Sequence, residues 1–201
     1  MTETSVPRYL TIEQVDDMID EGVEGVNHHL IYKTYTDKGY DPAQMFGLML
    51  ANDSSATKEN IQYYLDKGVD LNKSISAVIG LSYEIGTNKD DGQIVYKPST
   101  PLTICYATGN TNTAKLLIDM GADPNYPNQY GITPFEAILI QILPSCDDKS
   151  WMDVILSNLK EAYSIGVRPP SEFIINKDYL QLFIDYSSWF KDTLNETKNT
   201  I

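Results

Sequence analysis

The sequence predicts an all-α fold in which helix pairs repeat along the chain, and three observations support this class. Thr100-Pro101-Leu102 returns 33 residues later as Thr133-Pro134-Phe135. Helical patterns of apolar residues end at a glycine in several places. The 201 residues are 42% hydrophobic and 21% charged, the balance of an ordinary globular domain. A fixed period of this length is typical of repeat arrays, which stack short units into one continuous core.

The clearest unit begins at Thr100, where each of its characteristic residues has a mechanical role. Thr100 stands at the N-cap of a helix whose first residue is Pro101, a position where the missing N–H costs nothing. Gly109 ends this short helix. A second helix from Thr113 to Met120 carries one apolar face, and Gly121 supplies its left-handed C-cap.

The stretch from Thr100 to Asn125, with the turn Gly131-Ile132-Thr133-Pro134, resembles one complete ankyrin repeat. The resemblance implies two antiparallel helices and a β-hairpin finger formed by the polar turn from Asp123 to Gly131. The family usually has a histidine directly after Thr-Pro-Leu, whereas this chain has Thr103 and Glu136 there. We expect this departure to weaken the usual Thr–His hydrogen bonding and to indicate a divergent array.

Degenerate copies flank this unit on both sides. Upstream, a first helix near Pro42 to Asn52 precedes a second helix that ends at Gly68. Downstream, a first helix from Thr133 to Leu143 precedes a second helix that ends at Gly166, and Gln14 to Gly22 ends in the same way. The sequence therefore predicts an ankyrin-repeat solenoid of three to four helix-pair repeats with β-hairpin fingers and long insertions.

These units define a single domain, 1–201, and we expect the chain from Asn195 onward to fray. Its expected segments are N-terminal capping helices at 7–40, a degenerate repeat at 41–72, an insertion at 73–97, the best repeat at 98–130, a divergent repeat at 131–170 and a C-terminal helical cap at 171–194.

Successive repeat-ending glycines are farther apart than 33 residues, so the extra residues must lie in longer helices or in loops. Solenoids place such insertions on the surface. The largest lies at 73–96 and contains Ile75 to Gly80 and Gln93 to Tyr96, two apolar runs that favour a short β-hairpin. A functional insertion and a solvated spacer both fit this composition.

The chain is strongly acidic, with a formal net charge of −13. Affinity for phosphates comes mainly from cationic side chains, so this charge argues against a nucleic-acid partner and favours a protein with a basic surface. Neither a secretory leader nor an apolar run long enough for a membrane is visible, and Cys105 and Cys146 are read as free thiols. We expect a cytoplasmic protein that is monomeric when alone.

The sequence contains none of the phosphate-binding, zinc-protease, EF-hand or nucleophile-elbow motifs that identify common enzymes. His28 and His29 are adjacent, and neighbouring side chains of a strand point to opposite faces, so they make a poor chelate. Acidic pairs such as Asp16-Asp17 and Asp147-Asp148 are interpreted as solvated helix ends and loops, and Cys105 as a core residue. We expect no catalytic residue, no metal and no cofactor.

The ankyrin resemblance implies a partner-binding surface made by the finger tips and the exposed side of the first helices. Tyrosine suits such a surface because it brings a large contact area at low entropic cost. Tyr63, Tyr64, Tyr163 and Tyr179 are instead expected to pack between helices. The expected partner-binding residues are Tyr96, Lys97, Ser99, Ala107, Thr108, Tyr126, Gln129, Tyr130, Ile132, Ile140 and Gln141.

A second candidate surface lies on the predicted helix near the N-terminus, where acidic residues from Glu13 to Glu24 oppose an apolar face. This stripe fits either the steering of a cationic partner or the soluble outer face of a capping repeat. Three functions remain open from the sequence. They are an acidic immunity or inhibitor protein that neutralises a basic toxin or enzyme, a secreted effector that binds a host protein, and an enzyme with its site at 73–96.

Overall fold

The structure is a computed structural model that describes residues 8, 10, 14, 28–52, 56–75, 99–140 and 148–198. Within these residues the chain is helical, with no β-strand and two isolated β-bridges. The helices are α2 (His28–Asp37), α3 (Pro42–Asn52), α4 (Lys58–Asp66), α5 (Pro101–Ala107), α6 (Thr111–Asp119), α7 (Pro134–Leu139), α8 (Asp148–Ser164), α9 (Lys177–Tyr186) and α10 (Ser188–Lys198).

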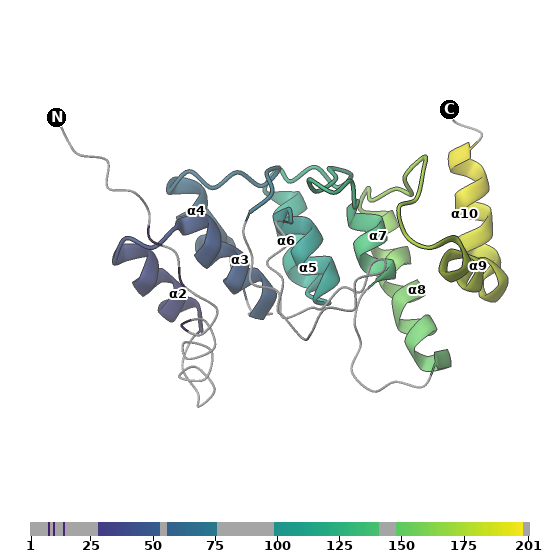
Figure 1. The fold of residues 1–201 in the computed structure, drawn as a ribbon, viewed down its shortest axis with the longest axis horizontal. Coiled ribbons are helices and arrows are strands. Elements are labelled where there is room, and N and C mark those ends of the chain that lie inside the picture. The colour runs from purple at the N-terminus through teal and green to yellow at the C-terminus, as the bar shows by residue number, and fades with distance from the viewer. Residues whose placement is uncertain are drawn as a thin grey trace.

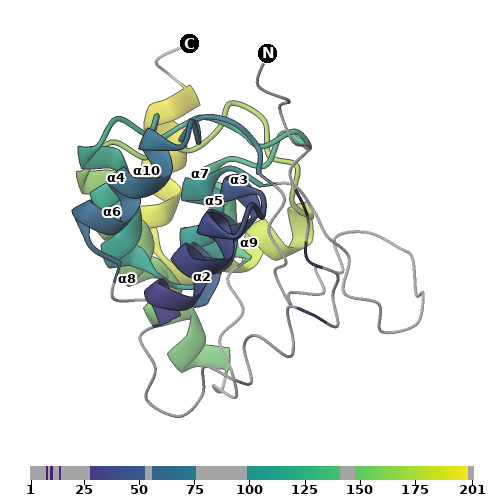
Figure 2. The same ribbon diagram turned by 90° about the vertical axis from the view of Figure 1, so that its left-hand side faces the viewer.

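The helices follow one another along the molecule in chain order, from α2 at one end to α9 and α10 at the other (Figure 1). First helices α3, α5 and α7 pack on one another, and each contacts the second helix that follows it: α4, α6 or α8. The end-on view shows these helices gathered one behind another (Figure 2). The all-α class expected from the sequence is therefore confirmed for the described residues.

Two helices begin as the Thr-Pro pattern predicts. The Thr100 hydroxyl accepts a hydrogen bond from the Thr103 amide at 3.2 Å, and the Thr133 hydroxyl accepts one from the Glu136 amide at 3.3 Å. Proline occupies the start of both α5 and α7. The Asp41 carboxylate accepts hydrogen bonds from first-turn amides of α3, which also begins with proline. The predicted bounds of α3 are confirmed.

The second helices α4, α6 and α8 end at glycines that adopt left-handed backbone conformations. The φ angles are +90° at Gly68, +105° at Gly121 and +106° at Gly166. A residue with a Cβ is strained in this region, so glycine is the favoured residue at each position. The predicted glycine register of these three units is confirmed, while Gly22 lies outside the described residues.

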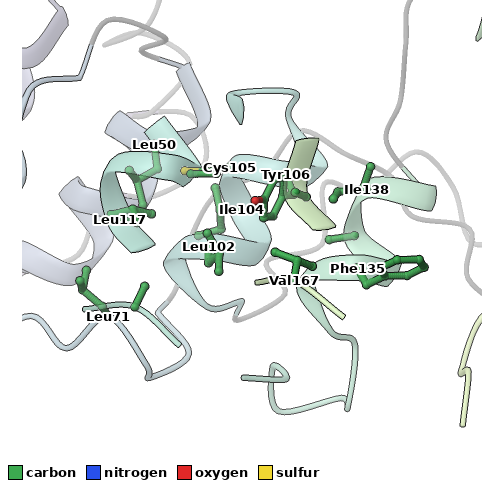
Figure 3. Packing of buried hydrophobic residues seen from close by; sticks show 14 of the residues in the cluster. Leu50, Leu71, Leu102, Ile104, Cys105, Tyr106, Leu117, Phe135, Ile138 and Val167 are labelled. Carbon is green, nitrogen blue, oxygen red and sulfur yellow. The ribbon is translucent and has the colours of Figure 1, made fainter. Parts of the chain in front are cut away.

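Both short first helices are buried along their whole length. Every residue of α5 and α7 is buried. Figure 3 shows side chains of α5 between Leu50 and Leu117 on one side and Phe135 and Ile138 on the other. Cys105 lies in this core with no exposed surface, as predicted. Burial raises the pKa of its thiol, so Cys105 is a packing residue.

The third position of each first helix carries a buried polar side chain, where we expected weakened hydrogen bonding. That expectation is wrong for Thr103 and Glu136. The hydroxyls of Thr100 and Thr103 lie 2.7 Å apart, and the Glu136 carboxylate accepts hydrogen bonds from the Thr133 amide and hydroxyl, both at 3.1 Å. Glu136 also accepts a bond from the Ile174 amide at 2.6 Å.

Gln44 is the equivalent residue of α3, and its side chain binds both backbone groups of Leu10. Its oxygen accepts from the Leu10 amide at 2.9 Å, and its nitrogen donates to the Leu10 carbonyl at 3.1 Å. Gln44 and Glu136 therefore each hold a neighbouring backbone segment against the start of a first helix. Glutamine and glutamate side chains, rather than histidine, make these connections.

The C-terminal segment, where we expected a helical cap, contains the two helices α9 and α10. The chain extends at Ser187, between the two helices. Aromatic rings of α9 and α10 cover the end of the row: the rings of Phe135 and Phe190 are 6.0 Å apart, and those of Trp151 and Phe183 are 5.5 Å apart. Helix α10 continues to Lys198, past Asn195, where we expected fraying to begin, and residues 199–201 lie outside the described residues.

Smaller differences concern helix ends. Helix α6 begins at Thr111 rather than Thr113, and α7 ends at Leu139 while the expected helix continued to Leu143. The predicted N-terminal acidic helix, most of the 73–97 insertion and Cys146 lie outside the described residues. An antiparallel bridge between Ile75 and Ser99 joins the two ends of that insertion. No described helix has the length and apolar character needed to span a membrane.

Glu136→Ala should lower the free energy of unfolding by about 2 to 4 kcal/mol, because one buried and several part-buried donors then lose their acceptor. Glu161→Ala is the matched control, since this glutamate of α8 is exposed, and it should change stability by less than about 0.5 kcal/mol. Urea unfolding followed by far-UV circular dichroism measures both values. Equal effects of the two substitutions would contradict the role assigned to Glu136.

Tyr106→Phe should leave stability unchanged or raise it by up to about 1 kcal/mol. The Tyr106 hydroxyl is buried and has no hydrogen-bond partner within the described part of the chain. Tyr179→Phe is the contrasting variant, because the Tyr179 hydroxyl donates to the Leu139 carbonyl at 2.6 Å. The free energy of unfolding of Tyr179→Phe should be about 1 kcal/mol lower in the same urea experiment. A destabilised Tyr106→Phe protein would show that this hydroxyl has a partner.

Candidate protein-binding surface

Three loops lie side by side along one edge of the helix row, at the top of Figure 1. They follow α4, α6 and α8 and span residues 67–75, 120–133 and 165–176. We call this edge the loop ridge. Repeated side-chain hydrogen bonds connect the three loops, and they position the side chains that the ridge exposes.

The connections between loops use asparagine at equivalent places. The Asn72 side chain accepts a hydrogen bond from the Asp123 amide at 2.8 Å. Asn125, in the next loop, accepts from the Arg168 amide at 2.7 Å and donates to the Gly166 carbonyl at 3.1 Å. In each case the backbone amide that donates to the asparagine side chain belongs to the residue two positions after the repeat-ending glycine. The pattern Gly-x-Asp-x-Asn in the sequence is therefore the local signal for loop stacking.

The aspartates of this pattern shape their own loops. Asp70 accepts a hydrogen bond from the amide of Asn72, and Asp123 accepts one from the amide of Asn125, both at 2.9 Å. An Asp side chain that binds the amide two residues on closes a tight turn. Each aspartate therefore orients the asparagine that reaches the neighbouring loop.

The tip of the central loop is held by Asn128, a buried residue that sequence reasoning missed. Its side-chain oxygen accepts hydrogen bonds from the amides of Tyr130 and Ile132, both at 3.0 Å. The backbone amide of Asn128 donates to the Ile132 carbonyl at 2.9 Å. The Gln129 amide also donates to the Ser74 hydroxyl of the preceding loop at 3.2 Å. The backbone that presents Gln129 and Tyr130 is thus held by hydrogen bonds both from Asn128 of its own loop and from Ser74 of the preceding loop.

Three large apolar side chains project from this edge. Tyr126 is 44% exposed, Tyr130 is 49% exposed and Ile174 is 48% exposed. Ile174 lies directly over Gly131, since a Cβ built at Gly131 would come within 2.6 Å of the Ile174 Cδ1. The Ile174 side chain therefore lies against the loop that carries Tyr130. No local pattern in the sequence pointed to Ile174, because the contact joins two loops whose register only the fold sets.

The predicted finger residues reach the surface only in part. Tyr126, Gln129 and Tyr130 are exposed, as the finger assignment required, and Ile132 is half-buried. The loop that carries them has no strand, so it is a hydrogen-bonded turn.

The predicted residues on and beside α5 are mostly buried, which corrects the expectation that they face solvent. Ser99 is buried because it pairs with Ile75 in the β-bridge, and Ala107 is buried because α5 packs between α3 and α7. Thr108 and Ile140, at helix ends, are half-buried. Tyr96, Lys97 and Gln141 lie outside the described residues.

Tyrosines expected to pack between helices do so to different degrees. Tyr64 is fully buried, while Tyr63, Tyr163 and Tyr179 are half-buried. The Tyr63 hydroxyl donates to Asp37 at 2.6 Å, and this bond holds the pKa of the Asp37 carboxyl below its usual value. Burial and the same carboxylate raise the pKa of Tyr63. These contacts join α2 to α4 and are structural.

The described residues hold no cluster of three or more His, Cys, Asp or Glu side chains that would bind a metal ion. The His29 ring stands edge-on to Tyr64, with ring centres 6.4 Å apart, which agrees with a packed histidine.

The family model of the ankyrin repeat matches residues 99–129. This segment contains α5, α6 and most of the central loop, so the chain contains an ankyrin repeat where the sequence resemblance placed it. An ankyrin repeat indicates a protein-interaction module. No curated protein matches the chain in sequence.

Asn125→Ala should lower the free energy of unfolding by about 1 to 2 kcal/mol, since it removes two hydrogen bonds between neighbouring loops. It should also speed amide hydrogen exchange at Arg168, whose amide loses its acceptor. Asn112→Ala, at an exposed position of α6, is the control and should not destabilise the protein, because alanine favours a helix. Unchanged exchange at Arg168 in Asn125→Ala would contradict the stacking role of Asn125.

Proposed function

We propose that this protein is a non-enzymatic binding module that engages another protein through its loop ridge. The observation that carries the proposal is the exposure of Tyr126, Tyr130 and Ile174 on a backbone that hydrogen bonds already hold in place. Exposed aromatic side chains on a rigid support are the usual energetic centres of protein interfaces. A braced loop also loses little conformational entropy on binding.

The net charge of −13 supports a partner with a basic surface. Long-range attraction between opposite charges accelerates association and weakens as salt screens it. An acidic inhibitor or immunity protein that covers a basic toxin or enzyme is the form of this function that the charge favours. In that form the loop ridge makes the direct contacts, while the overall negative charge increases the rate of association.

Replacing Tyr126 and Tyr130 together by alanine should abolish capture of the partner. The experiment immobilises the protein, exposes it to lysate of its native cells at ~50 mM and ~300 mM salt, a range over which exposed charges become screened, and identifies retained proteins by mass spectrometry. We expect one basic protein, retained less at the higher salt and lost in the double variant. Far-UV circular dichroism should show that the variant remains folded.

Leu30→Ala is the matched control, because Leu30 is 57% exposed on α2, away from the loop ridge. It should retain the partner as the unchanged protein does. Retention of the same protein by the double tyrosine variant would rule out the loop ridge as the binding surface. Recovery of an acidic partner would rule out the charge argument.

A further inference from the structure

A second exposed surface lies on α8 and α9, at the C-terminal end of the helix row (Figure 1). Leu182 is 51% exposed and Tyr186 is 37% exposed on α9, and Val154 is 41% exposed on the neighbouring helix α8. The ring contact between Trp151 and Phe183 holds the two helices together beneath these side chains. We call this surface the C-terminal stripe.

Helical periodicity places acidic residues on the same face as the apolar ones. Asp178, Leu182, Asp185 and Tyr186 fall at positions i, i+4, i+7 and i+8 of α9, so they share one side of the helix. Both aspartates are exposed, with Asp178 one turn before Leu182 and Asp185 between Leu182 and Tyr186. The stripe therefore alternates carboxylates with apolar contact area along the length of α9.

Asp153 adds a third carboxylate from α8, beside Val154. Its Oδ1 accepts the hydrogen bond of the Tyr186 hydroxyl at 2.8 Å, which joins the two helices and orients the tyrosine ring. The same bond raises the pKa of Tyr186. Every charge among the described side chains of this stripe is negative.

We propose that the C-terminal stripe binds a helical protein segment that presents leucine-like side chains flanked by lysine or arginine. Charge complementarity selects this occupant. Apolar groups of the segment would cover Val154, Leu182 and Tyr186, while its cations would pair with the three carboxylates. A second copy of the chain fits poorly, because both stripes would bring carboxylates together and each copy carries a net charge of −13. Docking of an amphipathic helix on such a face is a common recognition mode.

The test uses a fluorescein-labelled amphipathic helical peptide made of leucine and lysine, with binding to the full chain measured by fluorescence anisotropy. Leu182→Ser should raise the dissociation constant about tenfold or more, since an exposed leucine contact is lost. Asp178→Asn with Asp185→Asn should weaken binding and reduce its dependence on salt. All three positions are exposed, so both variants should keep the urea unfolding midpoint of the unchanged protein.

Two controls separate this surface from the loop ridge and from general electrostatic attraction. The Tyr126 and Tyr130 double variant should bind the peptide normally, so the outcome is independent of the function proposed above. Leu30→Ser, an exposed apolar position on α2, should also bind normally. Equal weakening by Leu30→Ser and Leu182→Ser, or no weakening by Leu182→Ser, would overturn the proposal.

Sedimentation velocity tests the alternative occupant of the stripe, a second copy of the chain. The proposal expects a monomer with and without Leu182→Ser. A dimer that Leu182→Ser dissociates would overturn the proposal, because the stripe would then be an interface between two copies of the chain. Chemical-shift changes on peptide addition should fall on amides of α9 and the adjoining part of α8. Shifts confined to other helices would also overturn it.

Discussion

The structure depends on the burial of short helices between their neighbours. Helix α5 has seven residues and α7 has six, lengths at which an isolated helix is unstable in water. Both become stable because every one of their residues is buried, with α5 held between α3 and α7. Each unit therefore requires the next one, which is the property that makes repeat arrays cooperative over short distances.

Polar side chains determine how far each unit shifts relative to its neighbour. Apolar packing tolerates small displacements, whereas a buried donor or acceptor left without its partner costs about 1 to 3 kcal/mol. Gln44 and Glu136 bind the backbone of adjacent segments inside the structure, and Asn72 and Asn125 do the same at its surface. Glu136, Asn72 and Asn125 bind the loops after α6 and α8 in this way, and the loop ridge is the consequence.

The two exposed surfaces of the molecule arise from different causes. On the loop ridge, the turn around Asn128 and the glycine beneath Ile174 bring aromatic and aliphatic side chains of separate loops together. On the C-terminal stripe, the periodicity of α9 alone aligns Leu182 with Asp185 and Tyr186. The ridge is therefore sensitive to how neighbouring units stack, while the stripe requires only that α9 forms and lies on α8.

Local signals in the sequence determined where several helices begin and end. Thr-Pro at the start of α5 and α7 and glycines with positive φ after α4, α6 and α8 act through their own backbone conformations, so they could be read without a fold. The register of the repeats likewise predicted α3 near its observed bounds. The single well-preserved ankyrin repeat followed from the same residues.

Tertiary structure alone decided which residues reach solvent and which loops meet. Ser99 and Ala107 match exposed positions of the repeat pattern, yet a bridge to Ile75 and packing of α5 between its neighbours bury them. Ile174 became part of the loop ridge through a contact with Gly131, from which more than forty residues separate it in sequence. Exposure and long-range contact depend on the register between units, and side chains distant in sequence set that register.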